Sequence, residues 1–179
     1  EFIHLIYDDG TIAWSYETGG DIRVAPSVLE LNNGDKIILA GSKDDNFYAL
    51  NSDGTVRFIV ETDDDITNEA SILDIEGVGP VIFFASSNVL YAVETDGDIY
   101  GEWMINIGSD ITSSIVFSKI NNATYVMFGD ESGKAHTYNI LGDSYNNFPI
   151  VYSFPFKGSP VVLDTDNDGD LELILGSTQ

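Results

Sequence analysis

Three features of the sequence predict an all-β fold built from a repeated unit. Short apolar segments alternate with turns along the chain, and apolar residues nowhere follow helical spacing. An Asp-Gly pair recurs at Asp9-Gly10, Asp53-Gly54 and Asp96-Gly97, at intervals of 44 and 43 residues. Each unit holds about four strand-like segments, and four strands in roughly 40–45 residues are typical of one β-propeller blade.

Each Asp-Gly pair predicts a tight hairpin between the third and fourth strands of its unit. The flanking segments are rich in β-branched and aromatic residues, as in IHLIYDDGTIAWSY and FYALNSDGTVRFIV. Asp and Gly tolerate the positive φ angles that such hairpin turns require. A degraded fourth copy of the turn is expected at Gly142, 45 residues after Gly97.

Two further landmarks place the first and second strands of each unit. The first strand begins near residues 26, 70, 114 and 160, in segments such as PSVL and PVVL. The second strand ends in a pair of small or polar residues, as in KIILAGS, VIFFASS, YVMFGDE and LILGST. We therefore predict one domain, 1–179, with four blades of four antiparallel strands. The predicted blades are 21–62, 65–108, 110–150, and 151–179 together with 1–18.

The last predicted blade combines strands from both ends of the sequence. The segment 151–179 supplies its first two strands, and the segment 1–18 has the pattern of a third and fourth strand. We expect Phe2–Tyr7 to pair antiparallel with Leu171–Leu175, because such pairing would remove two exposed sheet edges. Three arrangements remain open: closure within one chain, a fragment of a larger propeller, and pairing between chains to give a ring of eight blades or a filament.

The repeats resemble two known types of propeller repeat. DGTIAWSYETGGDIRVAPSVLELNNGDKIILAGSKDDNFYALNSDG has the Trp, the Gly-Gly turn, the Pro-Ser start and the YAL strand of the PQQ-like repeat. GSPVVLDTDNDGDLELILGS is similar to the FG-GAP repeat of secreted and surface propellers. The resemblance implies a propeller and an extracellular or cell-surface location, with a prokaryotic source. Nothing in the chain resembles a PQQ site, so that cofactor is not expected.

Residues 164–172 form the strongest candidate for a metal site. Their sequence is DTDNDGDLE, with carboxylates at the first, third, fifth and ninth positions and a glycine at the sixth. Ca²⁺ binds about six to eight oxygen ligands, and alternate side chains of a tight turn can converge on it. Leu175 stands where an EF-hand would have its last Glu, so the site is expected between two strands. The predicted ligands are Asp164, Asp166, Asp168 and Glu172 by their side chains and Asp170 by its backbone carbonyl.

Composition and charge exclude several kinds of partner. The chain has 30 acidic and 7 basic residues, giving a net charge of −23. Such a surface repels nucleic acid and anionic membranes, which are bound mainly through Lys and Arg. No apolar run approaches the roughly 20 residues of a membrane span. The chain has no Cys, which excludes disulfides, thiolate metal sites and Cys nucleophiles.

The sequence does not favour catalysis. His4 and His136 occupy the repeat position that holds Tyr48 and Tyr91 in the sister units, which indicates a packing role. Neither a Ser-His-Asp order nor a phosphate-binding glycine loop is present. Trp14 and Trp103 are expected in the core between blades, the alternative being an outer binding surface.

We therefore expect a non-enzymatic, extracellular structural or binding module, stabilised by Ca²⁺ and able to self-associate through open blade edges. The expected partners are further copies of the chain, another surface protein or a glycan, with no nucleic acid and no membrane insertion. The alternative function is a hydrolase or lyase acting on polysaccharide through carboxylates at one mouth of the propeller.

Overall fold

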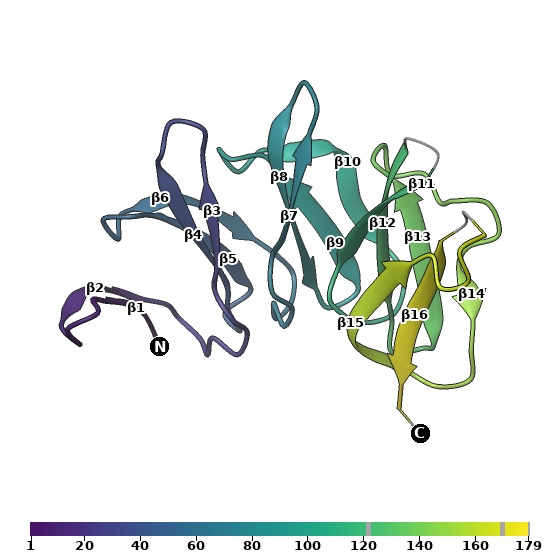
Figure 1. Ribbon diagram of the computed structural model, residues 1–179. Helices are drawn as coiled ribbons and strands as arrows, with labels where there is room; N and C mark the ends of the chain where they lie inside the picture. The colour runs from purple at the N-terminus through teal and green to yellow at the C-terminus, as the bar shows by residue number, and fades with distance from the viewer. Residues whose placement is uncertain (121–122, 169–170, 179) are drawn as a thin grey trace.

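The computed structural model describes residues 1–120, 123–168 and 171–178, and in these residues every regular element is a β-strand. The strands form a succession of antiparallel sheets that lie side by side along an arc (Figure 1). The prediction of an all-β propeller fold is therefore confirmed. None of the described residues belongs to a helix long and apolar enough to cross a membrane.

Three sheets in the middle of the arc have four strands each, in sequence order from one edge to the other. The first sheet contains β3 (Ser27–Glu30), β4 (Lys36–Gly41), β5 (Asn46–Asn51) and β6 (Val56–Glu61). The second contains β7 (Ser71–Ile75), β8 (Gly79–Ser86), β9 (Val89–Val93) and β10 (Ile99–Asn106). The third contains β11 (Val116–Ile120), β12 (Ala123–Gly129), β13 (Lys134–Asn139) and β14 (Ile150–Val151). We call these sheets blades 1, 2 and 3.

The two ends of the arc are two-stranded half-blades. The N-terminal half-blade contains β1 (Phe2–Ile6) and β2 (Ile12–Glu17), and the C-terminal half-blade contains β15 (Phe156–Leu163) and β16 (Glu172–Ser177). Among the described strands, β1 pairs with β2 alone and β16 pairs with β15 alone. The N-terminal strands therefore do not complete the last blade of the same chain. The packing between successive sheets leaves the two half-blades at opposite ends of the arc (Figure 1).

Strand registers define equivalent positions in the blades, which we call counterparts. In blade 1, Ala49 of β5 lies opposite Phe58 of β6, and in the N-terminal half-blade Leu5 lies opposite Trp14. The N-terminal half-blade therefore corresponds to the third and fourth strands of a blade. By the same comparison β15 and β16 correspond to a first and second strand, with Gly176 as the counterpart of Gly41.

Apolar clusters between successive sheets hold the arc together. One cluster joins blades 1 and 2 around Phe47 and Phe84, whose rings stack with centroids 3.9 Å apart. A second joins blades 2 and 3 around Trp103, which is fully buried and donates its indole N–H to the carbonyl of Ile140. Burial of each such large side chain stabilises the fold by about 1.5–3 kcal/mol. The prediction that Trp103 packs between blades is confirmed.

The glycines of the hairpin turns contribute to the same packing. A Cβ at Gly54 would lie 2.7 Å from the ring of Trp14 in the preceding sheet, and one at Gly97 would lie 2.8 Å from Phe58. The fourth-strand aromatics Trp14 and Phe58 thus pack against the glycine of the next hairpin, whereas a Cβ at Gly142 in blade 3 would lie 3.4 Å from Ile105. Gly54 also has a φ of +85°, which a residue with a side chain rarely adopts.

Candidate functional site

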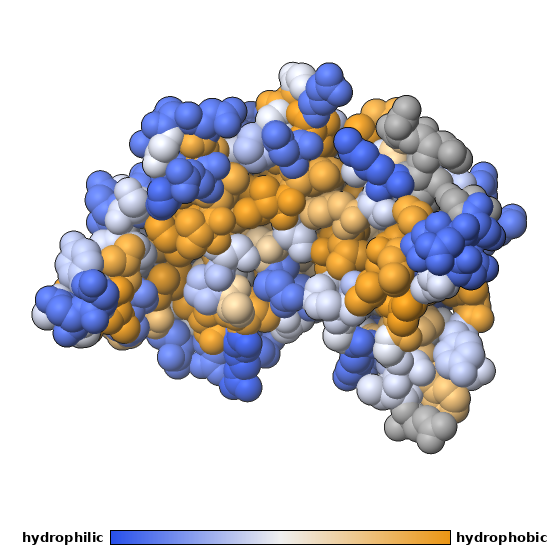
Figure 2. Space-filling view, in the orientation of Figure 1, coloured by the Kyte–Doolittle hydropathy of each residue, from blue (hydrophilic) through white to orange (hydrophobic). Residues whose placement is uncertain are grey.

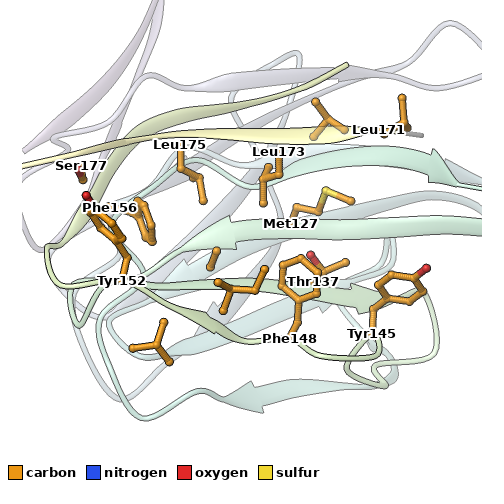
Figure 3. Close-up of a pocket in the computed structure, with 14 residues that line it drawn as sticks. Met127, Thr137, Tyr145, Phe148, Tyr152, Phe156, Leu171, Leu173, Leu175 and Ser177 are labelled. Carbon is orange, nitrogen blue, oxygen red and sulfur yellow. The ribbon is translucent and has the colours of Figure 1, made fainter. Parts of the chain in front are cut away.

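An apolar groove lies between blade 3 and the C-terminal half-blade. It has a volume of about 770 Å³ and is lined by side chains of β12 to β16 and of the segments that connect β13 to β14, β14 to β15 and β15 to β16. Leu171, Leu173 and Leu175 project from one side toward Met127 and a set of aromatic rings on the other (Figure 3). We call this feature the C-terminal groove. The apolar surface at this end of the arc is visible in Figure 2.

The C-terminal groove corresponds to the interface between the N-terminal half-blade and blade 1. That interface joins apolar residues of β1 and β2 to apolar residues of β4 and β5. Five of its positions have counterparts in the wall of the groove, assigned from the strand registers and their continuation. The counterpart pairs are Ile3 and Ala135, Trp14 and Phe148, Tyr16 and Ile150, Ile38 and Leu173, and Ala40 and Leu175.

Two positions of the complete interface have no counterpart in the groove. They are Tyr48 and Leu50 on β5, a third strand, and the C-terminal half-blade consists of a first and a second strand only. The counterparts of these two residues are His4 and Ile6 on β1, at the other end of the molecule. The groove is therefore a blade interface that lacks its third strand.

The face of β1 that carries His4 and Ile6 is exposed. Leu50 is 0 % exposed and Val93, its counterpart in blade 2, is also 0 % exposed, whereas Ile6 is 60 % exposed. Tyr48 and Tyr91 are buried, whereas His4 is exposed and hydrogen-bonds Ser15 at 2.8 Å. A preceding sheet covers β5 and β9, whereas the described residues contain no sheet that precedes the N-terminal half-blade.

The acidic turn predicted to bind Ca²⁺ connects β15 to β16. Oxygens of Asp164, Asp166 and Glu172 lie within 4.8 Å of one another, so the structure brings three of the predicted ligands together. Backbone and hydroxyl groups already contact these carboxylates. Thr165 donates both its N–H and its hydroxyl to Glu172 at 2.7 Å, and the N–H of Asn167 donates to Asp164 at 2.6 Å.

Of the two remaining predicted ligands, Asp168 is among the described residues and Asp170 is not. Asp168 lies on the turn, where its N–H donates to Asp166 at 3.3 Å, but its carboxylate is outside the three-residue cluster. Asp170 lies outside the described residues. Three hard oxygen donors on a tight turn match the chemistry that Ca²⁺ prefers.

A second acidic cluster was not predicted from the sequence. Carboxylate oxygens of Asp45, Asp64 and Asp65 lie within 4.8 Å of one another near the junction of blades 1 and 2. Lys43 pairs with Asp65 and supplies a positive charge to this cluster. Asp64 and Asp65 also line a polar pocket of about 330 Å³ together with Asp110 and Lys157.

The buried histidine is part of the scaffold of blade 3. His136 is 3 % exposed, its Nε2 lies 2.9 Å from Asp130, and its ring stacks on Phe128. Burial lowers the pKa of His136, although Asp130 partly opposes this shift. Burial alone would raise the pKa of Asp130, but hydrogen bonds from His136, Lys134 and Ser132 lower it overall. The lowered pKa values of His136 and Asp130 correspond to a neutral imidazole whose Nε2–H donates to an ionised carboxylate.

Comparison with known proteins gives the fold and no family. No family model and no curated protein matches the sequence. The structure is similar to BamB from Moraxella catarrhalis, with 18% identity and a TM-score of 0.62 over 89% of this chain and 46% of that one. It is similar to BBS1N in its complex with ARL6DN, with 12% identity and a TM-score of 0.67, covering 98% of this chain and 54% of that one. It is also similar to the computationally designed protein Ika4, with 14% identity and a TM-score of 0.58, covering 89% of this chain and 93% of that one.

At these identities the similarity shows the β-propeller fold alone. This chain spans about half the length of the BamB and BBS1N chains and nearly the whole length of Ika4.

Proposed function

We propose that the chain is a non-enzymatic, extracellular structural or binding module, a calcium-stabilised propeller that associates with other copies through its open blade edges. The observation that carries the proposal is the C-terminal groove beside the edge of β16, matched by the exposed apolar face of β1. A sheet edge presents open backbone donors and acceptors, and soluble proteins usually cover or pair such edges. Contiguous apolar surface next to an edge is typical of a protein interaction site.

The comparisons support a binding role in general terms. BBS1N, a structure with the same fold, was solved in a complex with ARL6DN. Propellers support many functions, so this similarity favours a protein partner without naming one. The proposal includes two further partner classes beside a second copy of the chain, namely another surface protein and a glycan.

The extracellular and calcium parts of the proposal rest on the acidic turn. Asp164, Asp166 and Glu172 would hold the ion between the two strands of the C-terminal half-blade, next to the groove. Extracellular modules bind Ca²⁺ with dissociation constants of about 10⁻⁴–10⁻³ M, which suits the calcium concentration outside cells. The similarity of this segment to the FG-GAP repeat supports the same location.

Sedimentation velocity over a range of protein concentrations tests the proposal. We expect a species heavier than one chain to grow with concentration, and to grow further with salt or Ca²⁺. The reason is that the net charge of −23 repels other copies and is screened by added ions. A chain that sediments as a monomer at every concentration and ionic strength would contradict self-association.

A second candidate function, a hydrolase or lyase acting on polysaccharide, is favoured by one observation. The polar pocket of about 330 Å³ is lined by Asp64, Asp65 and Asp110, and paired carboxylates can act as acid and base on a glycosidic bond. Asp65 pairs with Lys43, and Asp110 accepts a hydrogen bond from Ser87 at 2.6 Å. Release of reducing ends from acidic or neutral polysaccharides that is lost in Asp65→Asn would support this candidate over the first.

A further inference from the structure

We infer that two copies of the chain close into one ring, in which β1 of each copy enters the C-terminal groove of the other and pairs with β16. The β1–β2 hairpin of each copy would then complete the fourth blade of its partner. This inference rests on the proposed self-association, and it names the segment, the register and the number of copies. The surface that enters the groove is the exposed apolar face of β1 in the N-terminal half-blade of the other copy.

The lining of the groove matches the face of β1 that it would receive. In the complete interface, Tyr48 and Leu50 pack against the residues whose counterparts line the groove. His4 and Ile6 occupy these same two positions on β1. Ile6 is 60 % exposed and Phe2, on the same face, is 52 % exposed, so docking would bury apolar surface on both partners.

The repeat also fixes the register of the new strand pair. In blade 1 the second and third strands align Leu39 with Ala49 and Gly41 with Phe47. Their counterparts align Ile174 with Leu5, and Gly176 with Ile3. A shift by one residue would turn Ile6 away from the groove and Ile3 toward it, because successive side chains of a strand point to opposite faces. The pairing is therefore specified by one apolar face and is not a general edge contact.

A second surface of the half-blade would be covered by the same docking. Leu163 is 41 % exposed and Ile174 is 50 % exposed, whereas their blade 1 counterparts Leu29 and Leu39 are 6 % and 1 % exposed. Leu29 and Leu39 are covered by the following blade, blade 2. In the ring, the sheet that follows the C-terminal half-blade is blade 1 of the partner, which would cover Leu163 and Ile174.

The strand count of two copies gives complete blades. The described strands of each copy form three complete blades and two half-blades, so two reciprocal junctions would give a ring of eight blades. Two identical junctions related by a twofold axis close, whereas an angle that does not close would give a filament. The two ends of one copy lie at opposite ends of the arc (Figure 1).

Engineered cysteines test the junction directly, since the natural chain has none. Leu5→Cys and Ile174→Cys are made in separate chains, one of them carrying an affinity tag that changes its mass. Directly opposite residues in an antiparallel pair have Cβ atoms about 4.5–5.5 Å apart, close enough for a disulfide after small adjustment. We expect a covalent heterodimer of the two chains under mild oxidation. The matched control mixes Ile6→Cys with Ile174→Cys, whose side chains would face opposite sides and should not cross-link.

The double variant Leu5→Cys/Ile174→Cys distinguishes the ring from its alternatives. A ring gives one covalent product with twice the mass of the chain. A ladder of larger products would show a filament, and a cross-linked monomer would show closure within one chain. Either of these results would overturn the inference of a two-copy ring.

Sedimentation of the unmodified chain separates failure of this inference from failure of the proposed function. Association without the Leu5 to Ile174 cross-link would leave self-association standing and show that another surface mediates it. Absence of both association and cross-link would overturn the two together. Circular dichroism of each variant, compared with the unmodified chain, checks that the substitutions preserve the fold.

Discussion

The middle and the ends of this molecule use the same repeat positions in different environments. Leu39 in blade 1 is 1 % exposed, and its counterpart Ile174 in the C-terminal half-blade is 50 % exposed. Leu50 is 0 % exposed, and its counterpart Ile6 in the N-terminal half-blade is 60 % exposed. The residue types are equally apolar, so the difference comes from the neighbouring sheet that is present in one case and absent in the other. An apolar side chain at such a position indicates that a sheet packs there.

The largest expected effect comes from truncating the same position in the two environments. Leu39→Ala removes a buried side chain between blades 1 and 2 and should lower the free energy of unfolding by about 2–5 kcal/mol. Ile174→Ala should change the stability of the dilute monomer by less than about 1 kcal/mol because this side chain is half exposed. Urea denaturation at low protein concentration measures both. Equal losses for the two variants would show that Ile174 is covered within its own chain.

A smaller effect is expected from a methyl group added at two equivalent hairpin turns. Gly54 and Gly10 have φ angles of +85° and +86°, so alanine at either position incurs the backbone strain of about 1–2 kcal/mol. A Cβ at Gly54 would also meet Trp14 at 2.7 Å, whereas at Gly10 no atom lies within 4 Å. Gly54→Ala should therefore cost about 1–3 kcal/mol more than Gly10→Ala in the monomer. Melting temperatures that fall equally would show that Trp14 moves aside freely.

Binding of Ca²⁺ should stabilise the C-terminal half-blade by an amount similar to, or smaller than, the difference between Gly54→Ala and Gly10→Ala. A ligand that binds only the folded state at about ten times its dissociation constant adds about 1.4 kcal/mol. Chelation should lower the melting temperature of the chain, and Asp166→Asn should remove the difference between chelated and calcium-loaded protein. Asp35→Asn, in the β3–β4 turn, is the matched control and should retain the full calcium effect. Identical melting curves with and without Ca²⁺, together with no binding heat, would show that the acidic turn binds no metal.

The smallest effect concerns the protonation of His136. Burial lowers its folded pKa below the ordinary value of 6.5, so near that pH the unfolded chain binds a proton more readily than the folded chain. The contribution of neutral His136 is fully present above about pH 6.5 and is lost as the pH falls below that value. Asp130 acts in the opposite sense and at lower pH, because its folded pKa lies below 3.8.

His136→Tyr should therefore reduce the loss of stability on mild acidification, since Tyr48 fills the counterpart position in blade 1. The measurement is the urea midpoint on either side of about pH 6.5. His4→Tyr makes the same substitution at the exposed counterpart in β1 and is the matched control. An unchanged pH dependence in His136→Tyr would show that another group controls this range.

The repeat and its hairpins could be predicted because their signals are local. Asp-Gly turns between β-rich segments fix the third and fourth strands, and the buried strands β4 and β8 are continuous apolar runs. The path of the last blade could not be predicted in the same way. Pairing of β1 with β16 depends on the angle between successive sheets, which side-chain packing sets over the whole arc. The local pattern of Phe2–Tyr7 is the same whether its partner lies in its own chain or in another.

The two candidate sites differ in the same respect. The acidic turn is contiguous in sequence, so the spacing of its carboxylates was enough to predict that Asp164, Asp166 and Glu172 converge. The C-terminal groove combines Met127, Phe148 and Leu173, from three separate segments whose order in space depends on tertiary packing. The apolar character of Phe148 and Ile150 at fourth-strand positions was the available signal, but it fits a closed blade as well as an open one.

Hydrogen exchange of the backbone amides in β1 and β16 tests the central claim most directly. Among the described strands, β1 and β16 each have one edge without a partner strand, so in dilute solution their edge amides should exchange rapidly. The amides of β4 and β8 lie inside complete blades and should be protected. Raising the protein concentration should slow exchange in Phe2–Ile6 and Glu172–Ser177 together and leave β4 and β8 unchanged. Rapid exchange in both edge strands at concentrations where the protein is associated would contradict the claim that they complete one blade.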